Sequence, residues 1–234
     1  MKTLGRIALV LIFGLSASAA ASQDFEKGLM AAQMGEYTIA LEEWLPLAEQ
    51  GNVSAQYNLG LMYENGTGVP HDDVVAVKWY HMAADQGMAE AQDALGYKYA
   101  NGEGVSEDEA EAVKWYRLAA EQGYANAQNN LGVMYENGDG VSQDDRESVV
   151  WFRKAAEQGD QFARLNLGIR YELGRGVPQD NATAHMWYSL SFASGNQGAM
   201  MNLENLASKM APEELRKAEA MKKNCLRFQK KCGI

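Results

Sequence analysis

The chain has 234 residues, of which 31 are acidic and 21 are basic, so its formal net charge is −10 at neutral pH. This balance argues against nucleic acid or an anionic lipid surface as the main partner, because both need positive charge on the protein. The charge is unevenly spread. Residues 199–234 carry eight Lys and Arg against four Glu, a net charge of +4, which leaves an acidic body with a basic end. The simplest interpretation is that the charged residues of the acidic body and of the basic end lie on solvent-exposed surfaces.

Residues 1–21 have the three-part pattern of a secretory signal peptide. Two basic residues precede an apolar run over residues 7–15, and small residues follow that run. The run is too short to span a bilayer, and cleavage after Ala19 or Ala21 fits the small-residue rule. We expect an exported protein, periplasmic or secreted, with no membrane span after cleavage.

From residue 55 to residue 198 the chain repeats itself every 36 residues. Each copy carries a leucine followed by glycine, then a tyrosine, and later a tryptophan at matching positions. These recurring residues are Leu59, Leu95, Leu131 and Leu167; Tyr63, Tyr99, Tyr135 and Tyr171; and Trp79, Trp115, Trp151 and Trp187. A period of this length is typical of a solenoid, in which each repeat buries its apolar face against its neighbours.

Each repeat is predicted to contain two helices. In the repeat that begins at Ala91, apolar and aromatic residues recur at intervals of four and mark one helix face. That first helix should end at Gly102, which is suited to a helix C-cap. A glycine-containing loop follows, and Ser106 or Asp108 is suited to cap the second helix. The tryptophans, such as Trp115, are expected to lie in the core.

The recurring residues follow the pattern A-x-A-x-x-x-L-G-x-x-Y-x-x-G-x-G-V, then A-x-x-W-[YF]-x-x-A-A-x-x-G, which resembles the Sel-one-like repeat. This is a branch of the tetratricopeptide superfamily. The resemblance covers residues 24–208, and the copy from Ala89 shows nearly all of it; Leu173 departs from it by replacing a polar residue. The resemblance implies an all-α fold, a right-handed α-solenoid of stacked helix-turn-helix repeats whose first helices line a concave face. It also implies an exported bacterial scaffold or adaptor for other proteins.

Four segments are expected along the chain. They are a signal peptide over residues 1–21, an N-terminal tetratricopeptide-like repeat over 22–54, four 36-residue Sel-one-like repeats over 55–198, and capping helices over 199–234. The last helix should begin at Pro212, because proline suits the first turn of a helix. Terminal repeats with polar outer faces keep a solenoid soluble.

The two cysteines, Cys225 and Cys232, predict a local disulfide in an oxidising compartment. On one continuous helix they would lie about 10.5 Å apart along the axis, too far for a disulfide. The bond therefore requires the last helix to end before Cys232. An intermolecular disulfide is the alternative.

No catalytic or metal-binding motif stands out in the sequence. The three histidines, His71, His81 and His185, are scattered, and the chain lacks the motif H-E-x-x-H. It also lacks G-x-S-x-G and S-x-x-K, the motifs of serine hydrolases and penicillin-interacting enzymes. We therefore expect a protein that is not an enzyme and that needs no cofactor and no metal.

The expected concave face is the candidate binding site. It contains the residues just before each Leu-Gly pair together with their neighbours on the same helix. The candidate residues are Tyr57, Asn58, Leu61, Tyr97, Asn129, Asn130, Leu165, Asn166 and Ile169. Side-chain amides both donate and accept, so a row of asparagines suits the backbone of an extended peptide. Alternatively, the asparagines only bond to the neighbouring helix.

The leading hypothesis is a non-enzymatic protein–protein interaction scaffold in the bacterial cell envelope that binds a partner protein or peptide segment on this face. The alternative is an envelope protein that binds glycan or peptidoglycan, with Tyr57, Tyr97 and Trp79 against the sugar rings. A hydrolase, such as a β-lactamase-like relative, would need a nucleophile and a base that the sequence does not show.

Overall fold

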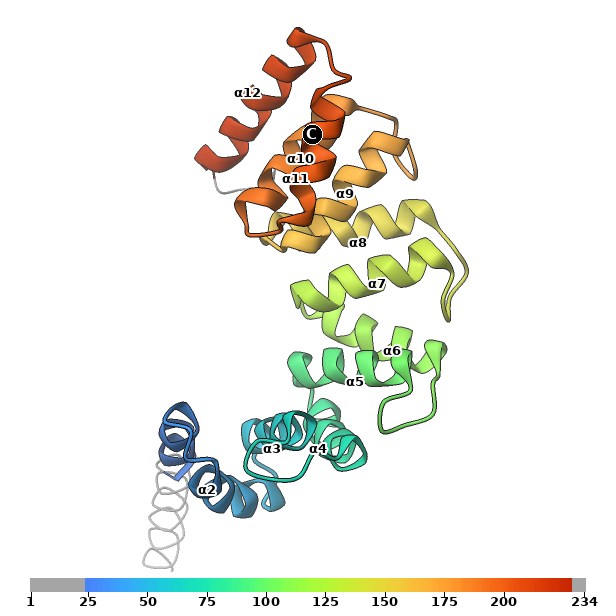
Figure 1. Ribbon diagram of the computed structural model, residues 1–234. Coiled ribbons are helices and arrows are strands. Elements are labelled where there is room, and N and C mark those ends of the chain that lie inside the picture. The colour runs from blue at the N-terminus through green and yellow to red at the C-terminus, as the bar shows by residue number, and fades with distance from the viewer. Residues whose placement is uncertain (1–23, 229–234) are drawn as a thin grey trace, which may run out of the picture. The chain divides into compact units, whose positions relative to one another are not determined.

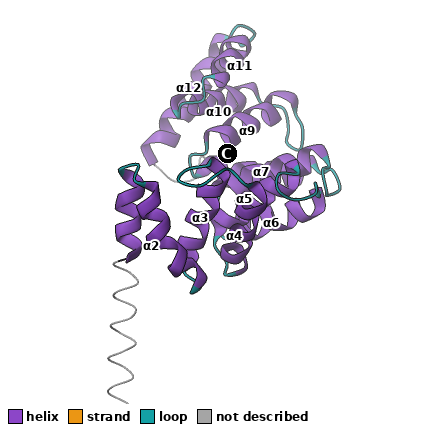
Figure 2. Ribbon diagram, turned by 60° about the horizontal axis from the view of Figure 1, so that its bottom comes forward, coloured by secondary structure: helices purple, strands orange, loops and turns teal. Residues whose placement is uncertain are grey.

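The computed structural model describes residues 24–228, which are helices joined by short connections, with no strand among them (Figures 1 and 2). The expected signal peptide and Cys232 lie outside the described residues. The chain divides into two compact units, one up to Glu107 and one from Asp108 onward. The prediction of an all-α solenoid fold is confirmed.

The first unit holds the N-terminal repeat and the beginning of the 36-residue array. Its first helix has a described part that covers residues 24–33. The following helices are α2 (Tyr37–Glu49), α3 (Val53–Asn65), α4 (Asp73–Asp85) and α5 (Ala89–Asn101). Each of α2, α3 and α4 packs against the helix that follows it.

The second unit holds the rest of the array and the C-terminal helices. They are α6 (Glu109–Glu121), α7 (Ala125–Asn137), α8 (Asp145–Glu157), α9 (Gln161–Leu173), α10 (Asn181–Ala193), α11 (Gly198–Ala207) and α12 (Pro212–Phe228). From α6 to α10 each helix packs against the next, and α11 and α12 both pack against α10. The proline at the start of α12 confirms the prediction for the last helix.

The ends of the helices follow the predicted capping chemistry. Gly102 ends α5 with a left-handed backbone (φ 68°), a conformation that glycine adopts without steric cost. Asp108, rather than Ser106, caps α6, and its carboxylate accepts a hydrogen bond of 3.0 Å from the backbone N–H of Glu111. Asp72, Asp144 and Asp180 cap α4, α8 and α10 in the same way.

The glycine of the Leu-Gly pair lets the two helices of a repeat approach closely. A Cβ built on Gly60 would lie 2.4 Å from the ring of Tyr80, and one on Gly132 would lie 2.6 Å from the ring of Phe152. Real Cβ atoms do not tolerate such contacts. The preceding leucines, including Leu59 and Leu131, are fully buried.

The tryptophans belong mainly to the core, as predicted. Trp44, Trp115, Trp151 and Trp187 are buried. Trp79 is half-buried and packs against the apolar cluster of the N-terminal repeat. Large buried rings at this period supply much of the apolar area that joins adjacent repeats.

The N-terminal repeat has a polar pair where the internal repeats have apolar residues. Gly28 meets the ring of Trp44 as Gly60 meets that of Tyr80, so Lys27 and Glu43 take the places of a leucine and a tryptophan. Lys27 and Glu43 form an ion pair with each other. This pair gives the first repeat a polar outer side, where no described repeat precedes it.

Candidate functional site

The predicted binding residues lie on the side of the first helices that is turned away from the buried Leu-Gly side. We call this side the first-helix face. In the first unit, Tyr57, Asn58 and Leu61 lie half-buried on α3, and Tyr97 is 48% exposed on α5. The ring of Tyr57 also packs on the ring of Tyr80, with centroids 5.7 Å apart.

In the second unit, two of the predicted asparagines bond to each other. The amide of Asn166 on α9 donates a hydrogen bond of 3.0 Å to the side-chain oxygen of Asn129 on α7. Asn130, the neighbour of Asn129, is half-buried and also has an interaction partner. At this point the amides link neighbouring repeats, which fits the alternative interpretation of the asparagines better than a row of free peptide-binding groups.

The first-helix face of α9 differs in chemistry from that of the other repeats. Four matching positions carry Ser54, Tyr57, Leu61 and Asn65 on α3; Glu90, Asp93, Tyr97 and Asn101 on α5; and Asn126, Asn129, Val133 and Asn137 on α7. On α9 they carry Phe162, Leu165, Ile169 and Leu173. We call these four residues the α9 stripe, because their spacing places them along one side of the helix.

The two end residues of the α9 stripe are exposed to solvent, and its two middle residues pack against the core. Phe162 is 55% exposed and Leu173 is 54% exposed, whereas Leu165 and Ile169 pack partly against the apolar core. One repeat further on, Met201 of α11 matches the position of Leu165 and is 76% exposed. Leu165 and Ile169 are among the residues predicted from the sequence, whereas Phe162 is not. The polar residues at its matching positions, Ser54, Glu90 and Asn126, are the signal that sets it apart.

Two buried cations, which the sequence analysis also missed, join adjacent repeats. Lys98 is 2% exposed, and its Nζ lies 2.7 Å from a carboxylate oxygen of Glu64, 2.8 Å from Asp73 and 2.7 Å from Glu103. Two repeats later, Arg170 pairs with Glu136 and Asp145, which match Glu64 and Asp73. At the same register the other two repeats carry the buried residues Met62 and Met134.

The charge of Lys98 is supported by its surroundings. Burial alone would lower the pKa of this ammonium group, but hydrogen bonds to Asp73, Glu103 and Glu64 outweigh burial and raise the pKa above its ordinary value. Burial with an ionic partner often marks functional sites. Here the cation is enclosed by side chains of its own and the preceding repeat, so a structural role accounts for it.

A second periodic feature is a series of buried glutamines. The side-chain amides of Gln56, Gln92 and Gln128 each donate a hydrogen bond to a carbonyl near the end of the preceding helix, at Ala48, Ala84 and Ala120. Arg164 takes this place in the last repeat and donates to the carbonyl of Ala156. Each of these carbonyls also accepts a hydrogen bond from the backbone N–H of the glycine three residues later, such as Gly87 for Ala84. The side chain is therefore a second donor, which links the first helix of one repeat to the end of the preceding helix.

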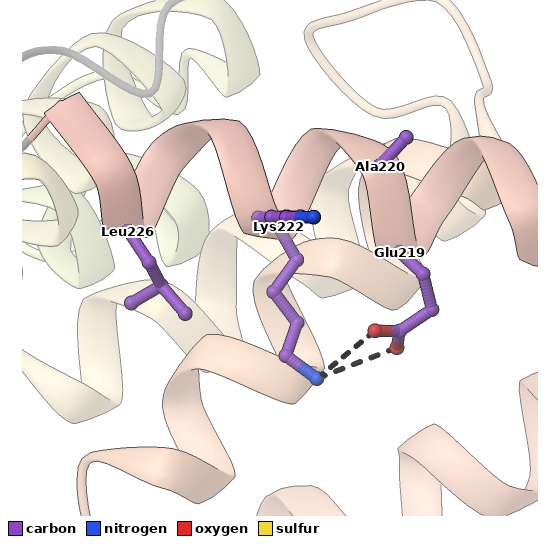
Figure 3. Close-up of a pocket in the computed structure, with 5 residues that line it drawn as sticks. Glu219, Ala220, Lys222 and Leu226 are labelled. Atoms are coloured by element: carbon purple, nitrogen blue, oxygen red, sulfur yellow. Dashed lines mark hydrogen bonds and ion pairs between the residues drawn. The ribbon is translucent and has the colours of Figure 1, made fainter.

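A shallow depression lies along α12, lined by Glu219, Ala220, Lys222, Lys223 and Leu226. Figure 3 shows Glu219 paired with Lys222 beside it, at 3.3 Å. The depression is open to solvent and bordered by charged side chains, unlike the enclosed pockets that bury most of a small ligand. Cys225, also on α12, is partly buried against the core, and its disulfide with Cys232 stays a prediction.

Two further features are absent from the described residues. These residues contain no group of three or more His, Cys, Asp or Glu side chains arranged to hold a metal ion. Within the same residues, no helix is both long enough and apolar enough to cross a membrane.

Comparison with known proteins agrees with this geometry. The Sel1 repeat family matches residues 53–88, 89–124, 125–160 and 161–196. Each match contains one first helix, its loop and one second helix of the array, from α3 to α10. A search of curated proteins returned no significant match.

Two solved structures share both sequence and fold with the chain. A protective antigen, c5321, of uropathogenic Escherichia coli strains, which displays an SLR fold, is 40% identical with a TM-score of 0.77. The alignment covers 85% of our chain and 43% of the antigen, so the chain spans less than half of that relative. A Sel1 repeat protein from Oxalobacter formigenes is 32% identical with a TM-score of 0.76, over 88% of our chain and 83% of that protein.

The fold extends to more distant proteins. The immunity protein Pa5087 from Pseudomonas aeruginosa matches with a TM-score of 0.51 at 22% identity, over 77% of our chain and 68% of that protein. At that identity the match concerns the fold alone. With four matched repeats that cover more than half of its length, the chain belongs to the Sel1 repeat family.

Proposed function

We propose that this protein is an exported, non-enzymatic scaffold of the cell envelope that binds an apolar segment of a partner protein on the α9 stripe. Sel1 repeat proteins are in general protein-interaction scaffolds. The stripe is the observation that carries the proposal for this chain. It presents four apolar side chains at positions where the other repeats carry mostly polar residues.

The chemistry of the stripe defines the kind of partner. Phe162 and Leu173 are 11 residues apart, which corresponds to about 16 Å along a helix. An amphipathic helix of about three turns presents apolar residues over the same length, and such helices bind apolar grooves through residues at i, i+3, i+4 and i+7. Exposed apolar side chains that form a continuous strip commonly mark protein interfaces.

The glycan alternative has less support from the tryptophans. Four of the five lie in the core, and Trp79 packs against the N-terminal cluster. A platform for sugar rings would then depend mainly on Tyr97, which is the most exposed of the three aromatic residues that the sequence suggested.

A crosslinked pull-down from the cell envelope tests the proposal, with variants taken from other repeats to preserve the fold. The test variant is Phe162→Ser with Leu173→Asn, because Ser54 and Asn65 occupy these positions on α3. The matched control is Val150→Lys, which changes an exposed apolar residue of the second helix α8 to the lysine found at 78 and 114. Circular dichroism would first establish equal helix content.

A protein captured by the wild type and the control but lost from the test variant is the expected result. Equal capture by all three would show that binding does not use the stripe.

Export has its own test, which is the mass of the protein recovered from the envelope fraction. We expect loss of the first 19 or 21 residues, and an intact N-terminus would refute cleavage.

A further inference from the structure

The last second helix, α10, is buried on every side. Residues 182–191 are all buried. On the earlier second helices the outward positions are open to solvent and carry Val74, Lys78 and Met82 on α4, or Arg146, Val150 and Lys154 on α8. On α10 these positions are Ala182, Met186 and Leu190. The helix that accounts for the difference is α12, which packs against α10 (Figure 1).

A histidine lies in this covered region, at a register where the other repeats carry valine. His185 matches Val77, Val113 and Val149, and it is 7% exposed. Its Nδ1 is buried and has no hydrogen-bond partner among the described residues. A buried polar atom without a partner is costly, and it becomes more so when the ring takes up a proton.

The charged groups near His185 come from α12. Of the helices that pack against α10, namely α9, α11 and α12, the described side chains that act electrostatically on His185 are Glu219 and Lys222 of α12. These two residues are paired with each other (Figure 3). An exposed ion pair of 3.3 Å joins Lys217 of α12 to Asp180, the residue that caps the start of α10.

We propose that α12 is an acid-released clasp, which protonation of His185 loosens from α10 and thereby uncovers the apolar residues Ala182, Met186 and Leu190. The burial of His185 supports release on acidification, because burial disfavours the protonated ring. Burial lowers the pKa of His185 below its ordinary value of 6.5; Glu219 raises it and Lys222 lowers it, with a net decrease.

The sign of the effect follows from linkage. Release of α12 takes Glu219 and Lys222 away from His185 and admits water on that side of the ring, so its pKa rises toward the ordinary value of about 6.5. The released state therefore binds the proton more readily, and its population rises as pH falls below about 6.5, by at most about tenfold per pH unit for one proton. Asp180 does not interfere in this window, because its pKa lies below the ordinary value of 3.8.

Hydrogen exchange measured by mass spectrometry on the full chain tests the clasp. Protection of α12 would be compared at pH 7.5 and pH 5.5, after correction for the intrinsic exchange rate, with α3 as internal reference. The wild type should lose up to about tenfold of the protection of α12 in this interval. His185→Val, which restores the residue of the other repeats, should lose none.

Two results would overturn the clasp: unchanged protection of α12 in the wild type, or an equal loss in His185→Val. A measurement that needs no variant is the NMR titration of the His185 ring. It should give a pKa below 6.5, and a value at or above 6.5 would mean that Glu219 stabilises the protonated ring and that acid tightens the contact. Replacing Glu219 by Gln should lower the pKa further.

Discussion

The buried Lys98 gives the sharpest prediction for stability. Its ammonium group lies within 2.8 Å of three carboxylates that belong to Glu64, Asp73 and Glu103. Lys98→Met would leave these three negative charges without their cation. The methionine side chain itself should fit, because Met62 and Met134 fill the same position in other repeats and are buried there.

The expected cost follows from the surroundings of the carboxylates. Removing one partner of a buried ion pair costs about 3–5 kcal/mol. The carboxylate side chains are 24–38% exposed, so water partly screens them once the cation is gone. We therefore expect the free energy of unfolding to fall by about 2–3 kcal/mol, which is less than the cost for a fully buried pair.

The assay is urea unfolding followed by circular dichroism at neutral pH. Lys114→Met is the control, because Lys114 is exposed and pairs with Glu111 one turn away, where such pairs contribute about 0.3–0.5 kcal/mol. A Lys98→Met protein as stable as the wild type would refute the reasoning. Adding Glu64→Gln and Glu103→Gln to Lys98→Met should recover part of the loss, because they remove uncompensated charges.

Other predictions concern the backbone, the caps and pH. Gly104→Ala should cost more than Gly87→Ala, since both have positive φ but only at Gly104 would the new Cβ meet backbone, 2.3 Å from a carbonyl oxygen; thermal unfolding compares them. Asp108→Ala should cost about 1 kcal/mol as a lost N-cap, and Asp108→Asn much less. Gln92→Ala should cost about 0.5–1.5 kcal/mol, because the carbonyl of Ala84 loses the amide of Gln92 but keeps the backbone N–H of Gly87. The stabilisation by Lys98 should persist below pH 10.5 and be lost only above it, since its pKa is raised, as alkaline unfolding would show.

Features that recur in every repeat were predictable from the sequence. The period of 36 residues places leucine, glycine and tryptophan in the core, and the caps at Gly102 and Asp108 follow from local chemistry. Each of these residues does the same physical task in each copy, so repetition itself exposes the task. The polar end formed by Lys27 and Glu43 was harder to predict, because the shorter loop of the first repeat hides its register.

Features that occur in only one or two repeats were missed, and they carry the individual character of the chain. A lysine at position 98 looks like surface until Glu64, 34 residues earlier, is seen to face it across a repeat boundary. The same reasoning applies to His185 among valines and to Phe162 among polar residues. The repeats contact mainly their neighbours, so the fold tolerates such departures as long as the local contacts are satisfied. A departure that leaves a polar atom unpaired, or an apolar ring in water, has no structural explanation within the repeat, and for that reason His185 and the α9 stripe are the places where function is best sought.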